Sequence, residues 1–127
     1  MARVTGIGGV FFKSDDPEKM HQWYEKNLGI KREHGYVAFN WREPDTSEEG
    51  MTTWSIFKRE SKYFDPSKSP MMINYRVDDL DALLEAMRAE GVEIDPKRED
   101  TDYGRFAWVI DPDGNKIELW EPPKASS

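Results

Sequence analysis

Two halves of the chain show the same order of sequence patterns at an offset of 62 to 63 residues, and this repetition constrains the fold more than any other feature. In each half, a short apolar run rich in β-forming residues ends at a pair of aspartates, and a helical pattern follows. The two runs are Ile7 to Lys13 and Met72 to Val77. A chain of 127 residues that repeats one unit twice is long enough for two half-size units with a shared core. We therefore expect a single domain over residues 1–127, with one repeat at about 4–60 and the other at about 70–122.

Each half contains one amphipathic helix in this prediction. The apolar residues recur at the spacing of one helix face, and they are Met20, Trp23, Tyr24 and Leu28 in the first half and Leu80, Leu83, Leu84 and Met87 in the second. Aspartates stand where N-caps belong, and Gly29 and Gly91 stand where the helices should end. We call the apolar residues on this face of each helix its apolar stripe. We expect Trp23, a residue of the first stripe, to lie in the core.

Strands are predicted in the remaining β-forming segments of both halves. One strand resumes after each helix, at Ile30 and Val92, and the others are Tyr36 to Trp41, Thr52 to Phe57, Phe106 to Ile110 and Lys116 to Trp120. The polar segment Ser61 to Pro70 is predicted to be a linker between the repeats, and the charged run Lys97 to Asp100 a solvated loop. The fold class is thus α+β, with two βαβββ repeats. Because one helix covers only one face of each sheet, the two bare faces are expected to form a cleft.

Composition excludes several classes of function. The chain has no cysteine, which excludes thiolate catalysis and zinc-thiolate or iron-sulfur sites. Its net charge of −7 argues against nucleic acid as the main partner, since phosphate binding needs clustered Lys and Arg. No apolar run approaches the roughly 18 residues of a membrane span, and no signal-peptide pattern opens the sequence. We expect a cytoplasmic protein with no membrane partner.

Three sequence motifs resemble those of the glyoxalase/bleomycin-resistance/dioxygenase superfamily, also called the vicinal oxygen chelate superfamily. They are YRVDDLDAL at 75–83, AEGVE at 89–93 and DPDGNKIELW at 111–120. The resemblance implies a curved mixed sheet of two βαβββ repeats around a cleft, and a homodimer. The fold of this superfamily hosts isomerases, ring-cleaving dioxygenases, thiol transferases and proteins that only bind a drug, so the resemblance leaves the reaction open.

The resemblance also locates the positions at which metal-dependent members bind a divalent cation. In this chain those positions carry Gly9, Ser55, Met72 and Glu118. Only Glu118 offers a suitable ligand, because hard or borderline cations prefer carboxylate oxygen or imidazole nitrogen. Neither histidine replaces a missing ligand, since His21 is expected on the solvent side of its helix and His34 either at the surface or near the cleft. We therefore expect no metal cofactor, and the alternative is a divalent metal site completed by a partner chain.

Strand alternation assigns a second set of residues to the cleft, because neighbours two positions apart share a face with the ligand positions. The candidate ligand-binding residues on this basis, together with tryptophans able to stack on a planar or cationic molecule, are Phe11, Lys13, Trp41, Trp54, Asn74, Arg76, Trp108, Lys116 and Trp120. For each tryptophan, ordinary core or dimer-interface packing is the alternative. Arg76 has the fork geometry that clamps a carboxylate or phosphate.

Glu118 is the candidate catalytic residue. In a partly apolar cleft, desolvation favours the protonated carboxyl group, which could then act as a general acid or base at a carbonyl-bearing substrate. The alternative is an ion pair of Glu118 with Lys116 or Arg76 that holds the strands in register.

Two functions follow from these patterns, and a third, an accessory domain that binds or regulates a protein partner, is left open by them. The first is metal-independent binding of a small organic molecule, as in a drug-resistance protein, because the metal ligands are missing while the aromatic lining is retained. The second is a glyoxalase-like lyase or isomerase, or a dioxygenase, that uses Glu118.

Overall fold

The structure is a computed structural model, and it describes residues 2–124. The first half contains β1 (Val4–Ser14), α1 (Pro17–Leu28), β2 (Val37–Arg42) and β3 (Glu49–Lys58). The second half contains β4 (Met71–Val77), α2 (Leu80–Ala89), β5 (Glu93–Thr101), β6 (Gly104–Ile110) and β7 (Lys116–Glu121). None of the helices in the described part of the chain is long and apolar enough to cross a membrane.

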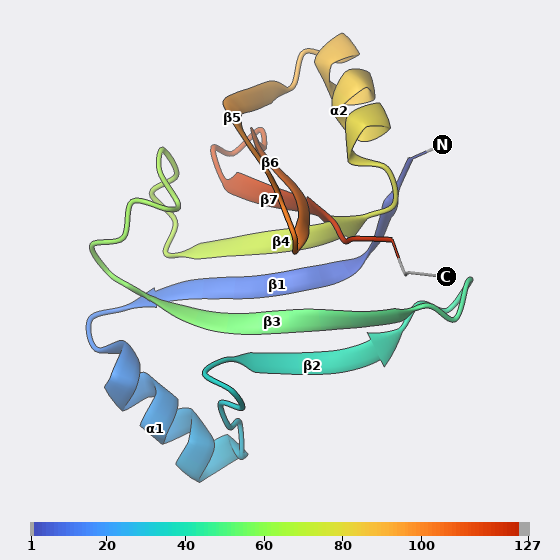
Figure 1. Ribbon diagram of the computed structural model, residues 1–127. Coiled ribbons are helices and arrows are strands. Elements are labelled where there is room, and N and C mark those ends of the chain that lie inside the picture. Colours follow the sequence, from blue (N-terminus) through green and yellow to red (C-terminus); the bar gives the residue numbers. More distant parts are fainter. Residues whose placement is uncertain (1, 125–127) are drawn as a thin grey trace.

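The strands form one mixed sheet in the order β2-β3-β1-β4-β7-β6-β5. The first strands of the two halves, β1 and β4, pair antiparallel at the centre, and each runs parallel to the last strand of its own half, β3 or β7. The repeats therefore join side by side within one chain, with α1 and α2 toward opposite ends of the sheet (Figure 1). This arrangement confirms the predicted α+β fold with repeated halves.

One predicted strand is absent from the first half. Between α1 and β2 the chain forms only an isolated bridge between Glu33 and Tyr36, whereas β5 occupies the corresponding place in the second half. His34 and Gly35 both have positive φ, 56° and 88°, so the chain turns sharply there instead of extending. Most side chains between Gly29 and Tyr36 are exposed and have little apolar surface to bury. The sheet consequently has seven strands, and β2 lies at its edge.

The charged run Lys97 to Asp100 lies within β5, so its prediction as a loop was wrong. β5 is the opposite edge of the sheet and pairs only with β6, with a register shift between Ile94 and Arg98. Charged side chains are common on edge strands, because one side of the strand faces water and charge discourages further strand pairing. The charge pattern therefore correctly predicted that these residues are exposed to solvent, but it did not predict that they form a strand.

The second half has a well-formed core beneath α2. Asp79 caps the helix by accepting a hydrogen bond from the backbone N–H of Ala82 at 3.1 Å. Leu80 and Leu84 are buried against a cluster formed by Val77, Ala107, Val109 and Leu119. These are the apolar positions that the helical spacing predicted, so sequence and packing agree here.

Helix α1 is held much more loosely. Asp16 caps it as expected, but none of its residues is buried. Trp23 is 53% exposed, so the expectation that it lies in the core was wrong. Tyr24 makes the main contact instead, with its ring 4.9 Å from that of Trp54 on β3. Since the first half has one strand fewer, the sheet offers α1 a narrower surface, and only part of the stripe is covered.

We predict that replacing Trp23 by Ala lowers the free energy of unfolding by less than about 1 kcal/mol, because most of the side chain is already in water. Leu84→Ala, in the corresponding helix, should cost about 2 to 5 kcal/mol because it leaves a cavity. Urea unfolding of both variants measures the two values. A Trp23→Ala variant as damaged as Leu84→Ala would contradict the loose packing of α1.

Candidate functional site

Side chains from three strands meet in one row across the sheet, next to a glycine of a fourth strand. The register places Asn74 of β4 opposite both Gly9 of β1 and Glu118 of β7, and Glu118 opposite Trp108 of β6. Arg76 lies two residues beyond Asn74, and therefore on the same face of β4. We call this side of the sheet the concave face.

Glu118 lies at the centre of this row and is 2% exposed. Its Oε2 accepts a hydrogen bond from Nδ2 of Asn74 at 2.5 Å, and its Oε1 accepts one from Nε1 of Trp108 at 3.1 Å. The hydroxyl of Tyr63 also donates to Oε1. A buried carboxylate is strongly destabilising unless such donors replace water, and here three uncharged donors of the same chain do so.

The segment between β3 and β4 covers Glu118. Phe64 is fully buried, and the ring of Tyr63 stacks on Phe57 at 5.5 Å. The ammonium group of Lys116 donates to the backbone carbonyl of Tyr63 at 2.9 Å, which fastens the segment to β7. Sequence patterns indicated only a linker at Ser61 to Pro70, because nothing in its polar composition shows that two aromatic residues turn inward.

An apolar cluster surrounds the covered carboxylate. Its buried members are Phe11, Phe64, Met72 and Trp108, with Phe57, Tyr63 and Phe106 packed against them. The cleft expected at this end of the concave face is therefore filled by the chain itself. Phe11 and Trp108, predicted to line a cleft, lie in this core.

The alternative of an ion pair at Glu118 does not match the contacts of the two candidate cations. Nζ of Lys116 lies 5.6 Å from the centres of both the Tyr63 and Trp108 rings, in cation–π contact. Arg76 pairs with Glu48 instead. Burial and the nearby charge of Glu118 raise the pKa of Tyr63 far above its ordinary value, so Tyr63 keeps its proton and remains a donor.

Arg76 forms the second polar group of the concave face. Its Nη1 donates to Oγ1 of Thr5 at 2.7 Å, and its Nη2 lies 3.3 Å from Oε2 of Glu48. The centre of the guanidinium is 5.7 Å from the centre of the Trp41 ring. Two residues predicted to bind a ligand, Arg76 and Trp41, are thus in contact with each other.

The remaining predicted residues lie in three different surroundings. Trp120 stacks on Phe106 at 6.4 Å and donates from Nε1 to the carbonyl of Tyr103 at 2.8 Å. Nζ of Lys13 lies 5.1 Å from the centre of the Phe64 ring. Trp54 lies apart from them, packed against Tyr24 of α1.

His21 also packs on Trp54, with ring centres 5.9 Å apart. Partial burial there lowers the pKa of His21. Its expected place on the solvent side of α1 was therefore wrong. The helical stripe did not reveal this contact because the side of α1 that meets the sheet contains His21 and Tyr24 and leaves Trp23 exposed.

The four positions that bind a cation in metal-dependent relatives do not suit one in this chain. A Cβ atom added at Gly9 would lie 2.7 Å from the Phe11 ring and 2.8 Å from Oγ1 of Thr53, so no ligand side chain fits there. Met72 is buried in the apolar cluster, Ser55 offers only a hydroxyl, and Glu118 already accepts three hydrogen bonds. Residues 2–124 contain no group of three or more His, Asp or Glu side chains placed to hold a metal.

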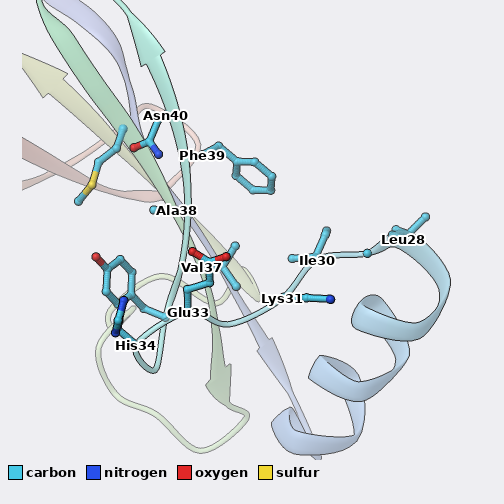
Figure 2. Close-up of a pocket in the computed structure, with 12 residues that line it drawn as sticks. Leu28, Ile30, Lys31, Glu33, His34, Val37, Ala38, Phe39 and Asn40 are labelled. Carbon is cyan, nitrogen blue, oxygen red and sulfur yellow. The ribbon is translucent and has the colours of Figure 1, made fainter.

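A separate hollow of about 400 Å³ lies between the end of α1 and β2. Figure 2 shows Leu28 and Ile30 on one side of it and Phe39 on the other, with His34 near the turn. His34 thus lies at this hollow, in the first half, rather than beside Glu118. The exposed side chains of Leu28 and Phe39 give the hollow an apolar rim.

Replacing Tyr63 by Phe should lower the free energy of unfolding by about 1 to 3 kcal/mol near pH 7, since a buried acceptor loses a donor. The pKa of Tyr63 is raised by folding, so its stabilising contribution is complete below its unfolded pKa of about 10 and is lost as pH rises above that value. The difference between wild type and variant should therefore shrink from about pH 10 upward. Urea unfolding at pH 7 and pH 11 measures it, and a difference that grows with pH would contradict the assigned contact.

Solved structures with the same fold include several methylmalonyl-CoA epimerases. The enzyme from Mycobacterium tuberculosis matches with a TM-score of 0.61 and 23% identity, covering 95% of this chain and 90% of that one. A Streptomyces coelicolor methylmalonyl-CoA epimerase in complex with 2-nitronate-propionyl-CoA matches with a TM-score of 0.66 and 16% identity, covering 96% and 100%. A Legionella pneumophila structure described as an NAD-dependent benzaldehyde dehydrogenase gives a TM-score of 0.58 and 16% identity, covering 91% and 98%.

A sequence comparison with curated proteins gives no match. A family model does match, over residues 6–119, and it spans both repeats and every strand of the concave face. The chain belongs to the Glyoxalase/Bleomycin resistance protein/Dioxygenase superfamily.

Proposed function

We propose that the protein binds a small organic molecule on its concave face without a metal ion, as the drug-binding members of the superfamily do. The observation that carries the proposal is that Glu118 is buried and fully hydrogen-bonded within the chain. Its Oε1 accepts hydrogen bonds from Tyr63 and Trp108, and its Oε2 accepts one from Asn74. The residues at the other three metal positions, Gly9, Ser55 and Met72, cannot complete a coordination sphere.

The arrangement supports a ligand at one end of the concave face. Tyr63 and Phe64 fill the end at Glu118, so Glu118 acts as the buried anchor of the segment that limits the site. The other end, around Arg76 and Trp41, presents a guanidinium and an aromatic ring in contact. These groups suit recognition of a small molecule with both polar and planar parts.

A second candidate function is that of an isomerase, or a lyase, that uses Glu118 as a base. Two observations favour it: the fold matches methylmalonyl-CoA epimerases, and the one retained carboxylate contacts a tyrosine hydroxyl. In this scheme Glu118 removes a proton from carbon next to a carbonyl group of the substrate, and it returns the proton later. Substrate reaches Glu118 only if Tyr63 and Phe64 move away, which makes this function the more demanding one.

A measurement of bound metal distinguishes the proposed metal-free binding from the metal-dependent chemistry of other superfamily members. Untagged protein dialysed against Mn²⁺, Co²⁺, Ni²⁺ or Zn²⁺ should retain far less than one ion per chain by elemental analysis, because Glu118 alone is a poor site. Glu118→Gln should retain the same small amount. One tightly held ion per chain that Glu118→Gln abolishes would overturn the proposal.

Ligand binding is tested on protein freed of metal with a chelator. A screen of aromatic, cationic and anionic small molecules should find compounds that quench tryptophan fluorescence saturably, and Trp41→Phe should lose a large part of the signal. Glu118→Gln should leave binding within about threefold, because Glu118 lies beneath the covering segment. Loss of a measured isomerase or lyase activity in a folded Glu118→Gln variant would instead favour the second candidate.

A further inference from the structure

Arg76 is an unusual feature of the concave face because it is a buried cation with an exposed partner. The residue is 7% exposed, whereas the side chain of Glu48 is 67% exposed. A guanidinium taken out of water normally needs well-fixed acceptors. A single contact of 3.3 Å to a solvent-exposed carboxylate is a weak substitute.

The turn that carries Glu48 does not depend on this contact. Glu43, which is buried, organises the turn by accepting hydrogen bonds from the backbone N–H groups of Asp45 and Thr46, both at 2.7 Å. Arg3 adds an ion pair to Glu43 at 3.1 Å. Because the turn is held from its other end, Glu48 can leave Arg76 without loss of the local structure.

Arg76 also has hydrogen-bonding capacity to spare. A guanidinium has five N–H donors, and the side-chain bonds found within residues 2–124 use Nη1 toward Thr5 and Nη2 toward Glu48. Nε of Arg76 has no such bond and is not among the buried side-chain atoms of this region that lack a partner, so this donor is in contact with solvent. An incoming carboxylate could therefore form the paired hydrogen bonds that Glu48 does not form.

The guanidinium is held ready in one orientation. Trp41 lies against it and is itself fixed by a hydrogen bond from its Nε1 to Oγ1 of Thr52 at 2.9 Å. The ring also lies directly on Gly6 and Gly50, where an added Cβ would come within 2.5 Å and 2.4 Å of its atoms. Thr5 then fixes one edge of the guanidinium at 2.7 Å. A preorganised fork of this kind recognises a planar anion without much loss of side-chain freedom.

We propose that Arg76 recognises a carboxylate group on the ligand, and that Glu48 occupies the position of that carboxylate while the site is empty. The inference rests on the proposed function, since it names the chemical class of the ligand on the same concave face. The ligand carboxylate displaces Glu48 and binds Arg76 through both of its oxygens. Glu48 thus competes with the ligand and weakens its binding.

The experiment uses acetate as the probe and follows the indole N–H of Trp41 and the Nε–H of Arg76 by NMR. Titrations are made in a chelator and at constant ionic strength with chloride, so that metal binding and screening do not contribute. Acetate should shift both signals saturably in the wild type. Glu48→Gln should bind acetate about fivefold more tightly, the factor expected from removal of an ion pair worth roughly 1 kcal/mol. Acetamide, which is uncharged, should shift neither signal.

Matched variants separate recognition from a structural role. Glu49→Gln removes the neighbouring exposed carboxylate, which pairs with Arg42 at 3.2 Å, and it should leave acetate binding unchanged. Arg76→Lys keeps the charge but loses the fork, and it should weaken binding at least about tenfold. If Arg76→Lys does not fold, Glu48→Gln and Glu49→Gln alone decide the question.

Three results would overturn the inference. The first is a folded Glu48→Gln variant that shows no saturable shift with acetate, or no gain over the wild type. The second is an equal response to acetamide, and the third is binding of inorganic phosphate in place of acetate. A chain that holds a metal ion would refute the proposed function but leave these chelated titrations unaffected, so the two failures can be told apart.

Discussion

The burial of one carboxylate organises the centre of this molecule. Glu118 lies on β7, and its three donors come from β4, β6 and the segment before β4. A charge in such a place is tolerated only when its hydrogen bonds are satisfied, so those three elements must occupy fixed positions around it. The same requirement draws Tyr63 inward, and Phe64 follows it into the apolar cluster. The concave face is therefore closed at one end because of Glu118.

The closing of the concave face over Glu118 and the lack of metal ligands there result from the same packing arrangement. Gly9 leaves the space that Phe11 fills, and Met72 adds apolar surface where a metal-dependent relative has a ligand. A divalent cation would need polar ligands and water in the region that aromatic rings occupy here. The residues around Glu118 form a well-packed core in place of a coordination site.

The sequence predicted the fold well because the fold depends on local patterns. The caps, the apolar stripe of α2 and the strand alternation are short-range signals, and they identified the two repeats. The strand predicted after Gly29 is absent because the prediction came from the symmetry of the repeats, while the residues themselves are mostly exposed. Trp23 was misplaced for a related reason: helical spacing defines a face, but only the width of the neighbouring sheet decides how much of it is covered.

The candidate site was harder to predict because it depends on contacts between distant residues. Alternation placed Asn74, Arg76 and Glu118 on one face, and the register agrees with this. The partners of these residues were not visible, since Tyr63 lies 55 residues from Glu118 and Glu48 lies 28 residues from Arg76 in the chain. Such pairings follow from the course of two loops, for which composition gives no geometry.

The unequal anchoring of the two helices has a consequence for how the molecule fluctuates. Local opening requires little free energy where few apolar contacts are broken, and α1 has no buried residue while α2 has two. Amide hydrogens of α1 should therefore exchange with solvent through a partial unfolding that leaves the second half intact. Arg76 belongs to the firmly packed half, but Trp41 and Glu48 come from the half with the looser helix. A molecule bound to both Arg76 and Trp41 would add contacts between the two halves and draw the exchange rates of the first toward those of the second.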